Sequence, residues 1–132
     1  MLDVELFGAP LCTDAPPAEE IRRLCMLTAA SAGVQEGHLA IEFVDAERIA
    51  ELNASHRGHA GPTDVLSFPI DGAEPPRGAP HELGDVVICP AHTSDLREAI
   101  VHGVLHLLGM DHETDDGQML ALQRELLARS TD

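Results

Sequence analysis

The sequence contains no tryptophan, tyrosine or lysine, and its only aromatic residues besides histidine are Phe7, Phe43 and Phe68. Surfaces that stack nucleobases need aromatic rings, so the composition provides little material for one. All eight basic residues are arginine, against 23 acidic residues, which gives a formal net charge of −15. A field of that sign repels nucleic acid and favours cations or basic proteins. Composition alone therefore argues against a nucleic-acid enzyme.

Cysteine is also scarce. The three cysteines, Cys12, Cys25 and Cys89, are an odd number, lie far apart and form no CxxC pair, which argues against a disulfide framework and a four-cysteine zinc site. Cys25 and Cys89 lie in apolar stretches and are expected to be buried thiols.

Long apolar runs are missing as well. No stretch approaches the roughly 20 residues that cross a bilayer, and residues 1–10 place no basic residue ahead of an apolar segment, as a secretory signal would. We therefore expect no membrane span and a cytoplasmic location. The length of 132 residues, 44% of them hydrophobic, predicts a single globular domain over residues 1–132.

Four short segments have the composition of β-strands. Leu2–Phe7 and His38–Val44 are expected strands in the first third of the chain. Val65–Phe68 and Val86–Cys89 are brief apolar runs separated by DGAEPPRGAPHE, whose proline and glycine content predicts an exposed loop. We expect these last two strands to form a hairpin with a long loop.

Apolar residues at helical spacing predict helices in the remaining segments. The first expected helix starts at Pro16 or Pro17 and stops at Gly33, and a second, short helix follows an N-cap at Asp45. The third runs from a cap at Thr93 or Ser94 to about Leu108, and the fourth runs from about Asp115 to Ala128.

The most informative segment is HGVLHLLGMDH. Residues four apart lie on one face of a helix, so His102 and His106 can present nitrogens to one ion. Gly109 can adopt the left-handed conformation that ends a helix, which folds the chain so that His112 approaches the same ion. Three neutral nitrogen ligands leave one position of tetrahedral zinc open, as in catalytic sites. Water bound there would ionise near neutral pH.

Two acidic residues are candidates to support these ligands. Glu98 shares a polar stripe with His102 and His106, outside the apolar arc of the helix. It can orient a ligand or shuttle a proton, or it can be an ordinary acidic residue of a first helical turn. Asp111 can accept the second N–H of a ligand, or simply stabilise the turn.

The spacing of the histidines and Gly109 equals that of the HExxHxxGxxH proteases, in which the glutamate is the general base. Gly103 occupies that position here, which disfavours peptide hydrolysis by the usual route. A zinc peptidase or amidase remains an alternative, and it would need a carboxylate within one water of the ion.

A second candidate residue lies upstream, in LNASHRGHAGPTDVLSFPI. Arg57 is expected in a short connection between a helix and a strand, and its planar guanidinium matches the oxygens of a phosphate. Asp64 and Ser67 are expected to have structural roles. The same holds for the remaining histidines, His38, His56, His59, His81 and His92.

Together, LNASHRGHAGPTDVLSFP, LGDVVICP and HGVLHLLGMDH, in this order and followed by an acidic turn and a helix, resemble the YbeY family of bacterial single-strand-specific endoribonucleases and rRNA maturation factors. The resemblance runs from about Ile41 to the C-terminal helix. It implies an α+β domain with a small mixed sheet, a zincin-like metal helix followed by a turn, one zinc ion on His102, His106 and His112, and Arg57 as the functional arginine. One departure is that only twelve residues separate Cys89 from His102, where the family has a longer helical connection.

The resemblance implies cleavage of single-stranded RNA, maturation of the 3′ end of the small-subunit rRNA, and ribosome quality control. Basic ribosomal proteins or an assembly GTPase would then be partners of the acidic surface. Two routes stay open, attack by metal-activated water and attack by the ribose 2′-OH. A third possibility is a non-catalytic assembly factor that zinc stabilises.

Overall fold

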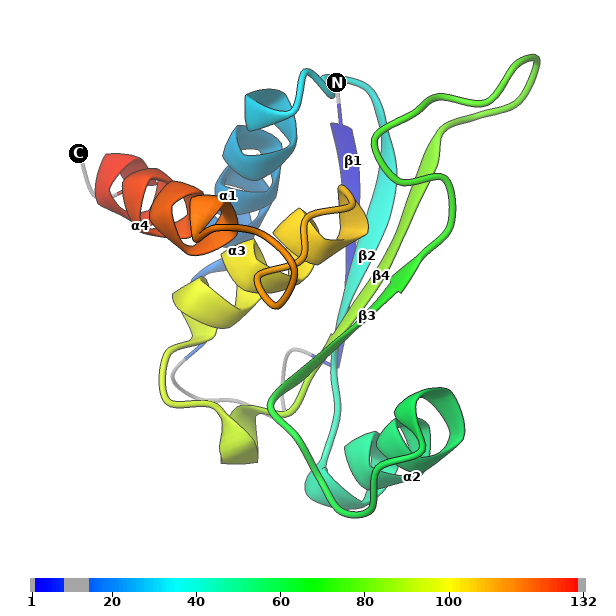
Figure 1. Ribbon diagram of the computed structural model, residues 1–132, viewed down its shortest axis with the longest axis vertical. Coiled ribbons are helices and arrows are strands. Elements are labelled where there is room, and N and C mark those ends of the chain that lie inside the picture. Colours follow the sequence, from blue (N-terminus) through cyan, green and yellow to red (C-terminus); the bar gives the residue numbers. More distant parts are fainter. Residues whose placement is uncertain (1, 9–14, 131–132) are drawn as a thin grey trace.

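The computed structural model describes residues 2–8 and 15–130 (Figure 1). Its elements, in chain order, are β1 (Leu2–Phe7), α1 (Ala18–Ser31), β2 (Gly37–Phe43), α2 (Ala46–Arg57), β3 (Val65–Pro69), β4 (Glu82–Ile88), the short 3₁₀ turn η2 (Pro90–His92), α3 (Leu96–Leu107) and α4 (Gln118–Ser130). The fold is α+β with a mixed sheet, as predicted.

The four strands form one sheet in the order β1-β2-β4-β3. β1, β2 and β4 run parallel, and β3 pairs antiparallel with β4 at the edge. The expected hairpin of β3 and β4 is confirmed, but β4 begins at Glu82, earlier than the sequence indicated. Leu83 is fully buried and Gly84 pairs with Pro69, so the strand extends upstream of the apolar run that starts at Val86.

Helices cover the sheet unequally. α1, α3 and α4 lie together on one face (Figure 1), where Val86 and Ile88 join the main core. On the other face α2 packs over a smaller cluster that includes Val87 and Cys89. Successive residues of β4 thus point to opposite faces, as the pleat of a strand requires. β3 and β4 therefore lie between α2 on one side and α3 on the other.

The start of α3 differs from the prediction. Its N-cap is Asp95, whose side chain accepts a hydrogen bond from the Glu98 backbone N–H at 3.2 Å. Thr93 is unavailable because its hydroxyl donates to the Cys89 carbonyl at 2.7 Å, and Ser94 lies one residue before the cap. Asp95, which would lie in the first turn of the helix expected from the sequence, is thus the N-cap itself, and α3 starts after it.

The predicted N-cap of α2 is confirmed, whereas the last helix starts later than the expected Asp115. Asp45 caps α2, accepting a hydrogen bond from Arg48 N–H at 2.8 Å. Asp115 accepts a hydrogen bond from Met119 N–H at 2.9 Å, so it caps the first turn although α4 begins at Gln118.

Gly103 lets α3 approach the sheet closely. A Cβ at this position would lie 2.4 Å from Cγ1 of Val86 and 3.3 Å from Cγ2 of Val65. The Ser67 hydroxyl of β3 donates to the Gly103 carbonyl at 2.9 Å, which ties the two elements together. The close approach holds the α3 turns that carry His102 and His106 beside β3.

Cys25 and Cys89 are buried free thiols, as expected, and Cys12 lies outside the described residues. Among the described helices, none combines the length and apolar character of a membrane span.

Candidate metal centre

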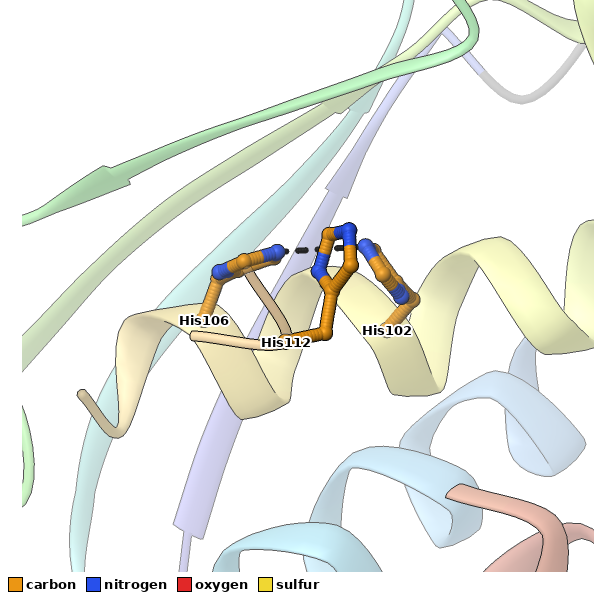
Figure 2. A group of neighbouring side chains, drawn as sticks. All are labelled: His102, His106 and His112. Carbon is orange, nitrogen blue, oxygen red and sulfur yellow. Dashed lines mark hydrogen bonds between the residues drawn. The ribbon is translucent and has the colours of Figure 1, made fainter. Parts of the chain in front are cut away.

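The three histidines of the HGVLHLLGMDH segment come together in space, as predicted (Figure 2). His102 and His106 project from successive turns of α3, and their Nε2 atoms are 3.1 Å apart. Gly109 has a φ of 97°, the left-handed conformation that ends the helix, and the following turn brings His112 over the same side. One ring nitrogen from each residue lies within 4.8 Å of the other two.

These imidazoles fit a single transition-metal ion. Two nitrogens bound at about 2.0–2.1 Å to tetrahedral zinc are roughly 3.3 Å apart, close to the 3.1 Å between the Nε2 atoms of His102 and His106. The Nδ1 atom of His112 is buried and has no hydrogen-bond partner among the described residues. A cluster of half-buried imidazoles with an unpartnered nitrogen is a donor set that suits zinc and several other transition metals.

The surroundings of His106 favour the protonation state in which it binds a metal. Burial lowers the pKa of His106, and the neighbouring His102 and His112 lower it further. A hydrogen bond with the Met110 backbone and the charge of Asp111 oppose this shift without reversing it. His106 is therefore neutral at neutral pH, the form that coordinates a metal.

Gln123 of α4 also contacts the cluster, and sequence reasoning missed it. The Nδ1–H of His102 donates to Gln123 Oε1 at 2.8 Å. Gln123 is 5% exposed and lies next to Leu122 on the apolar face of α4, between Met119 and Leu126. An amide within that apolar stripe is the signal that could have identified it.

One cleft of about 620 Å³ joins the histidine cluster to α2 and β3. Its lining residues are His56, Arg57, Asp64, Val65, Leu66, Ser67, Pro69, His102, His106, Asp111, His112 and Glu113. The sequence-predicted Arg57 and the three histidines therefore share one cavity although they come from distant parts of the chain.

Arg57 is the last residue of α2, rather than part of the connection expected from the sequence, and it is exposed to the cleft. The helix ends there because Gly58 adopts the left-handed conformation, with φ of 71°. The amide of Asn53 donates to the Gly61 carbonyl at 3.0 Å, which anchors the following loop to α2. Within the described part of the chain, Arg57 has no ion-pair partner, so its guanidinium is available to a ligand.

The two acidic candidates take different places. Asp111 lines the cleft, and its Oδ1 accepts a hydrogen bond from Glu113 N–H at 2.9 Å, which braces the turn that carries His112. Glu98 is exposed and lines a separate cavity of about 110 Å³ that it shares with His102 and Asp64.

Of the histidines treated as structural, His56 lines the cleft and packs against Phe68 with ring centroids 4.3 Å apart. His81 donates through Nε2 to the Gly72 carbonyl at 2.7 Å, a structural contact.

His38 bridges strands on the sheet face away from α1, α3 and α4. Its Nδ1 lies 2.7 Å from Glu82 of β4 and its Nε2 lies 2.6 Å from Glu5 of β1. Burial lowers the pKa of His38, but the hydrogen bonds to Glu82 and Glu5 outweigh it, so the pKa is raised overall.

Comparison with known proteins identifies the family of this chain. The family model for Endoribonuclease YbeY matches residues 14–131. A protein of this name from Bifidobacterium animalis subsp. lactis is 46% identical over 109 residues, covering 70% of this chain and 60% of the relative. One from Corynebacterium jeikeium is 42% identical over 113 residues, covering 68% and 61%. The chain thus spans about three fifths of the length of these relatives.

The solution structure of TM1509 from Thermotoga maritima has the same fold, with a TM-score of 0.57 over 96% of this chain and 88% of that one, at 22% identity. The family model extends over nearly the whole chain, including Arg57 and all three clustered histidines. The chain therefore belongs to the YbeY family.

Proposed function

We propose that this protein is a metal-dependent endoribonuclease that cleaves single-stranded RNA, with Arg57 in a catalytic role and His102, His106 and His112 as ligands of one zinc ion. The observation that carries the proposal is the shared cleft. It is lined by three imidazoles from α3 and its following turn and by a guanidinium without an ion-pair partner among the described residues. The names of the relatives give independent support for an endoribonuclease.

The charges of the cleft explain why a metal is needed. Asp64, Asp111 and Glu113 line it together with Arg57, so without an ion the carboxylates outnumber the guanidinium and repel a phosphodiester. A bound zinc ion supplies two positive charges, a Lewis acid for the phosphoryl oxygens and activation of the attacking oxygen. Its three imidazole ligands add no negative charge that would offset this.

The protein's own groups then have separate tasks. His102, His106 and His112 hold the ion as neutral ligands on one wall. Arg57 donates two parallel N–H bonds to the non-bridging oxygens of the phosphate and stabilises the charge that develops there. Asp111 holds the turn that carries His112 through its bond to Glu113 N–H. Glu98, in the neighbouring cavity, remains a candidate to shuttle a proton, but it does not orient His102, whose Nδ1 bonds to Gln123.

The attacking oxygen comes either from water or from the ribose 2′-OH of the substrate. Attack by water leaves a linear phosphate end, whereas attack by the 2′-OH leaves a 2′,3′-cyclic phosphate. Analysis of the ends produced by the zinc-loaded protein distinguishes the two routes.

A peptidase is the less favoured use of the same three histidines. A side chain at position 103 would run into Val86 rather than into the cleft, so this helix has no place for the glutamate of the HExxH proteases. The cleft arginine also suits a phosphate better than an amide.

The cellular role that we propose is maturation of the 3′ end of the small-subunit rRNA and ribosome quality control in the cytoplasm. With a net charge of −15, the outer surface repels RNA and suits basic ribosomal proteins or a basic face of an assembly GTPase. Association with ribosomal particles should then weaken as salt rises. Salt-insensitive association would contradict this electrostatic proposal.

Cleavage of a single-stranded RNA by the zinc-loaded protein tests the function. We expect His106→Ala to abolish cleavage together with stoichiometric zinc binding, and Arg57→Ala to reduce kcat by about 10²–10³ with zinc affinity unchanged. Arg48→Ala is the matched control, because Arg48 lies on the same helix and pairs with Glu51 at 3.2 Å. Full activity of Arg57→Ala would instead favour a zinc-stabilised assembly factor, and activity on peptides that depends on His106 would favour a peptidase.

A further inference from the structure

A hydrogen bond between Gln123 and His102 joins α4 to the histidine cluster. Gln123 is almost fully buried, and its Oε1 accepts a hydrogen bond from His102 Nδ1–H at 2.8 Å. A neutral imidazole carries one N–H, and an amide oxygen can accept but not donate. The bond therefore assigns the proton of His102 to Nδ1 and leaves the lone pair on Nε2.

The lone pair on His102 Nε2 points toward the other two histidines of the cluster. His102 Nε2 is the atom 3.1 Å from His106 Nε2 (Figure 2), so it faces the cluster while Nδ1 faces α4. With the opposite tautomer, a hydrogen on Nε2 would occupy the place of the ion. The orientation of the ring and its tautomer thus depend on one acceptor that lies 21 residues further along the chain.

We infer that Gln123 is a positioning residue for the metal centre: its amide oxygen holds His102 in the tautomer and orientation that bind the ion. The inference rests on the metal site of the proposed function, but it does not depend on RNA being the substrate. Outer hydrogen-bond partners of this kind typically change metal affinity by about 10–100-fold when they are removed.

The packing of α4 fixes the position of this oxygen. Met119 and Leu126, on either side of Gln123, are fully buried in the main core, and Arg23 of α1 donates to the Ser130 carbonyl at the end of the helix at 3.1 Å. The turn that carries His112 leads directly to Asp115, which caps the helix. Because coupling between two equilibria is reciprocal, metal binding in turn stabilises the docking of α4.

Gln123→Met is the direct test, because it removes the acceptor and leaves a flexible apolar side chain of similar length. We expect the affinity for zinc alone, measured by competition with a chromogenic chelator, to fall about 10–100-fold. Gln123→Glu keeps an acceptor oxygen and should restore an affinity close to that of the unmodified protein. Gln118→Met is the matched control, since Gln118 lies on the same helix but accepts from Asp116 N–H at 2.7 Å.

The tautomer of His102 is a second readout, which needs no metal. Two-bond ¹H–¹⁵N spectra of the metal-free protein, recorded at a pH where imidazoles are neutral, should show His102 with its hydrogen on Nδ1, and Gln123→Met should lose this preference. Circular dichroism confirms that each variant is folded. The proposal is overturned if His102 in the unmodified protein carries its hydrogen on Nε2, or if a folded Gln123→Met binds zinc as tightly as the Gln118→Met control. RNA is absent from both measurements, so failure to cleave RNA leaves their outcome unaffected.

Discussion

Replacing Gly103 with alanine tests how closely α3 must approach the sheet. In an ordinary helix interior this change stabilises a protein by about 1 kcal/mol, because alanine has the higher helix propensity. Here the new Cβ would lie 2.4 Å from Cγ1 of Val86 and 3.2 Å from its Cγ2, whereas carbon atoms in contact prefer about 3.5–4.0 Å. Val86 cannot yield easily, because it is fully buried in a central strand and its β-branched side chain is stiff.

The two effects have opposite signs and the steric one should dominate. Overpacking a core typically costs about 1–3 kcal/mol and occasionally more. The distance from the new Cβ to Val86 Cγ1 is more than about 1 Å shorter than a normal carbon–carbon contact, so the cost should lie at the upper end of this range. After subtracting the propensity gain, we expect Gly103→Ala to lower the free energy of unfolding by about 1–2 kcal/mol. The helix must move away from β4 to make room for the new methyl group.

Urea denaturation of the metal-free protein, followed by circular dichroism, measures the stability. The partner variants are Val86→Ala alone and the double variant Gly103→Ala with Val86→Ala, which together form a double-mutant cycle. Removing the Val86 methyl groups frees the space that the new Cβ needs, so we expect a favourable coupling of about 1–2 kcal/mol. A Gly103→Ala protein more stable than the original, with additive effects in the cycle, would refute the reasoning.

Further predictions concern individual contacts. Ser67→Ala should lower the free energy of unfolding by about 1 kcal/mol, measured in the same urea assay, because it removes the hydroxyl bond to α3; no change would show that this bond contributes nothing. The raised pKa of His38 means that its bridge to Glu5 and Glu82 is fully stabilising below the ordinary imidazole pKa and is lost as pH rises through the folded value. His38→Gln should therefore lower the melting temperature at pH 6 more than at pH 9, and an equal effect at both would contradict the assignment. Burial raises the pKa of Cys25 to about 12, so peptide mapping after treatment with a thiol reagent at pH 8 should find it unmodified until the protein unfolds; rapid labelling in the folded state would show that the site opens.

The histidine cluster could be predicted from the sequence because its geometry is local. Helical spacing fixes His102 and His106, and a glycine in the left-handed conformation fixes the turn to His112, so eleven consecutive residues contain the information. The antiparallel pairing of β3 and β4 could also be predicted, since it follows from two apolar runs and the loop between them.

Features that depend on packing between distant segments could not be predicted in this way. Gln123 reaches His102 only because α4 docks against α3, and the role of Gly103 depends on Val86 across the interface. The sequence identified Arg57 by its chemistry, but its place in the same cleft as the histidines follows from the packing of α2 against β3 and β4. The start of β4 was misplaced because Gly84 and Asp85 do not continue the apolar run, and only their pairing with β3 identifies them as part of the strand.

The most direct test of the metal centre is anomalous diffraction at the zinc absorption edge from crystals of the zinc-loaded protein. We expect one ion per chain, bound by His102, His106 and His112 and by no fourth side chain, with Arg57 facing it across the cleft. An ion located elsewhere, or a carboxylate of Asp111 or Glu113 filling the fourth position, would contradict an open catalytic site.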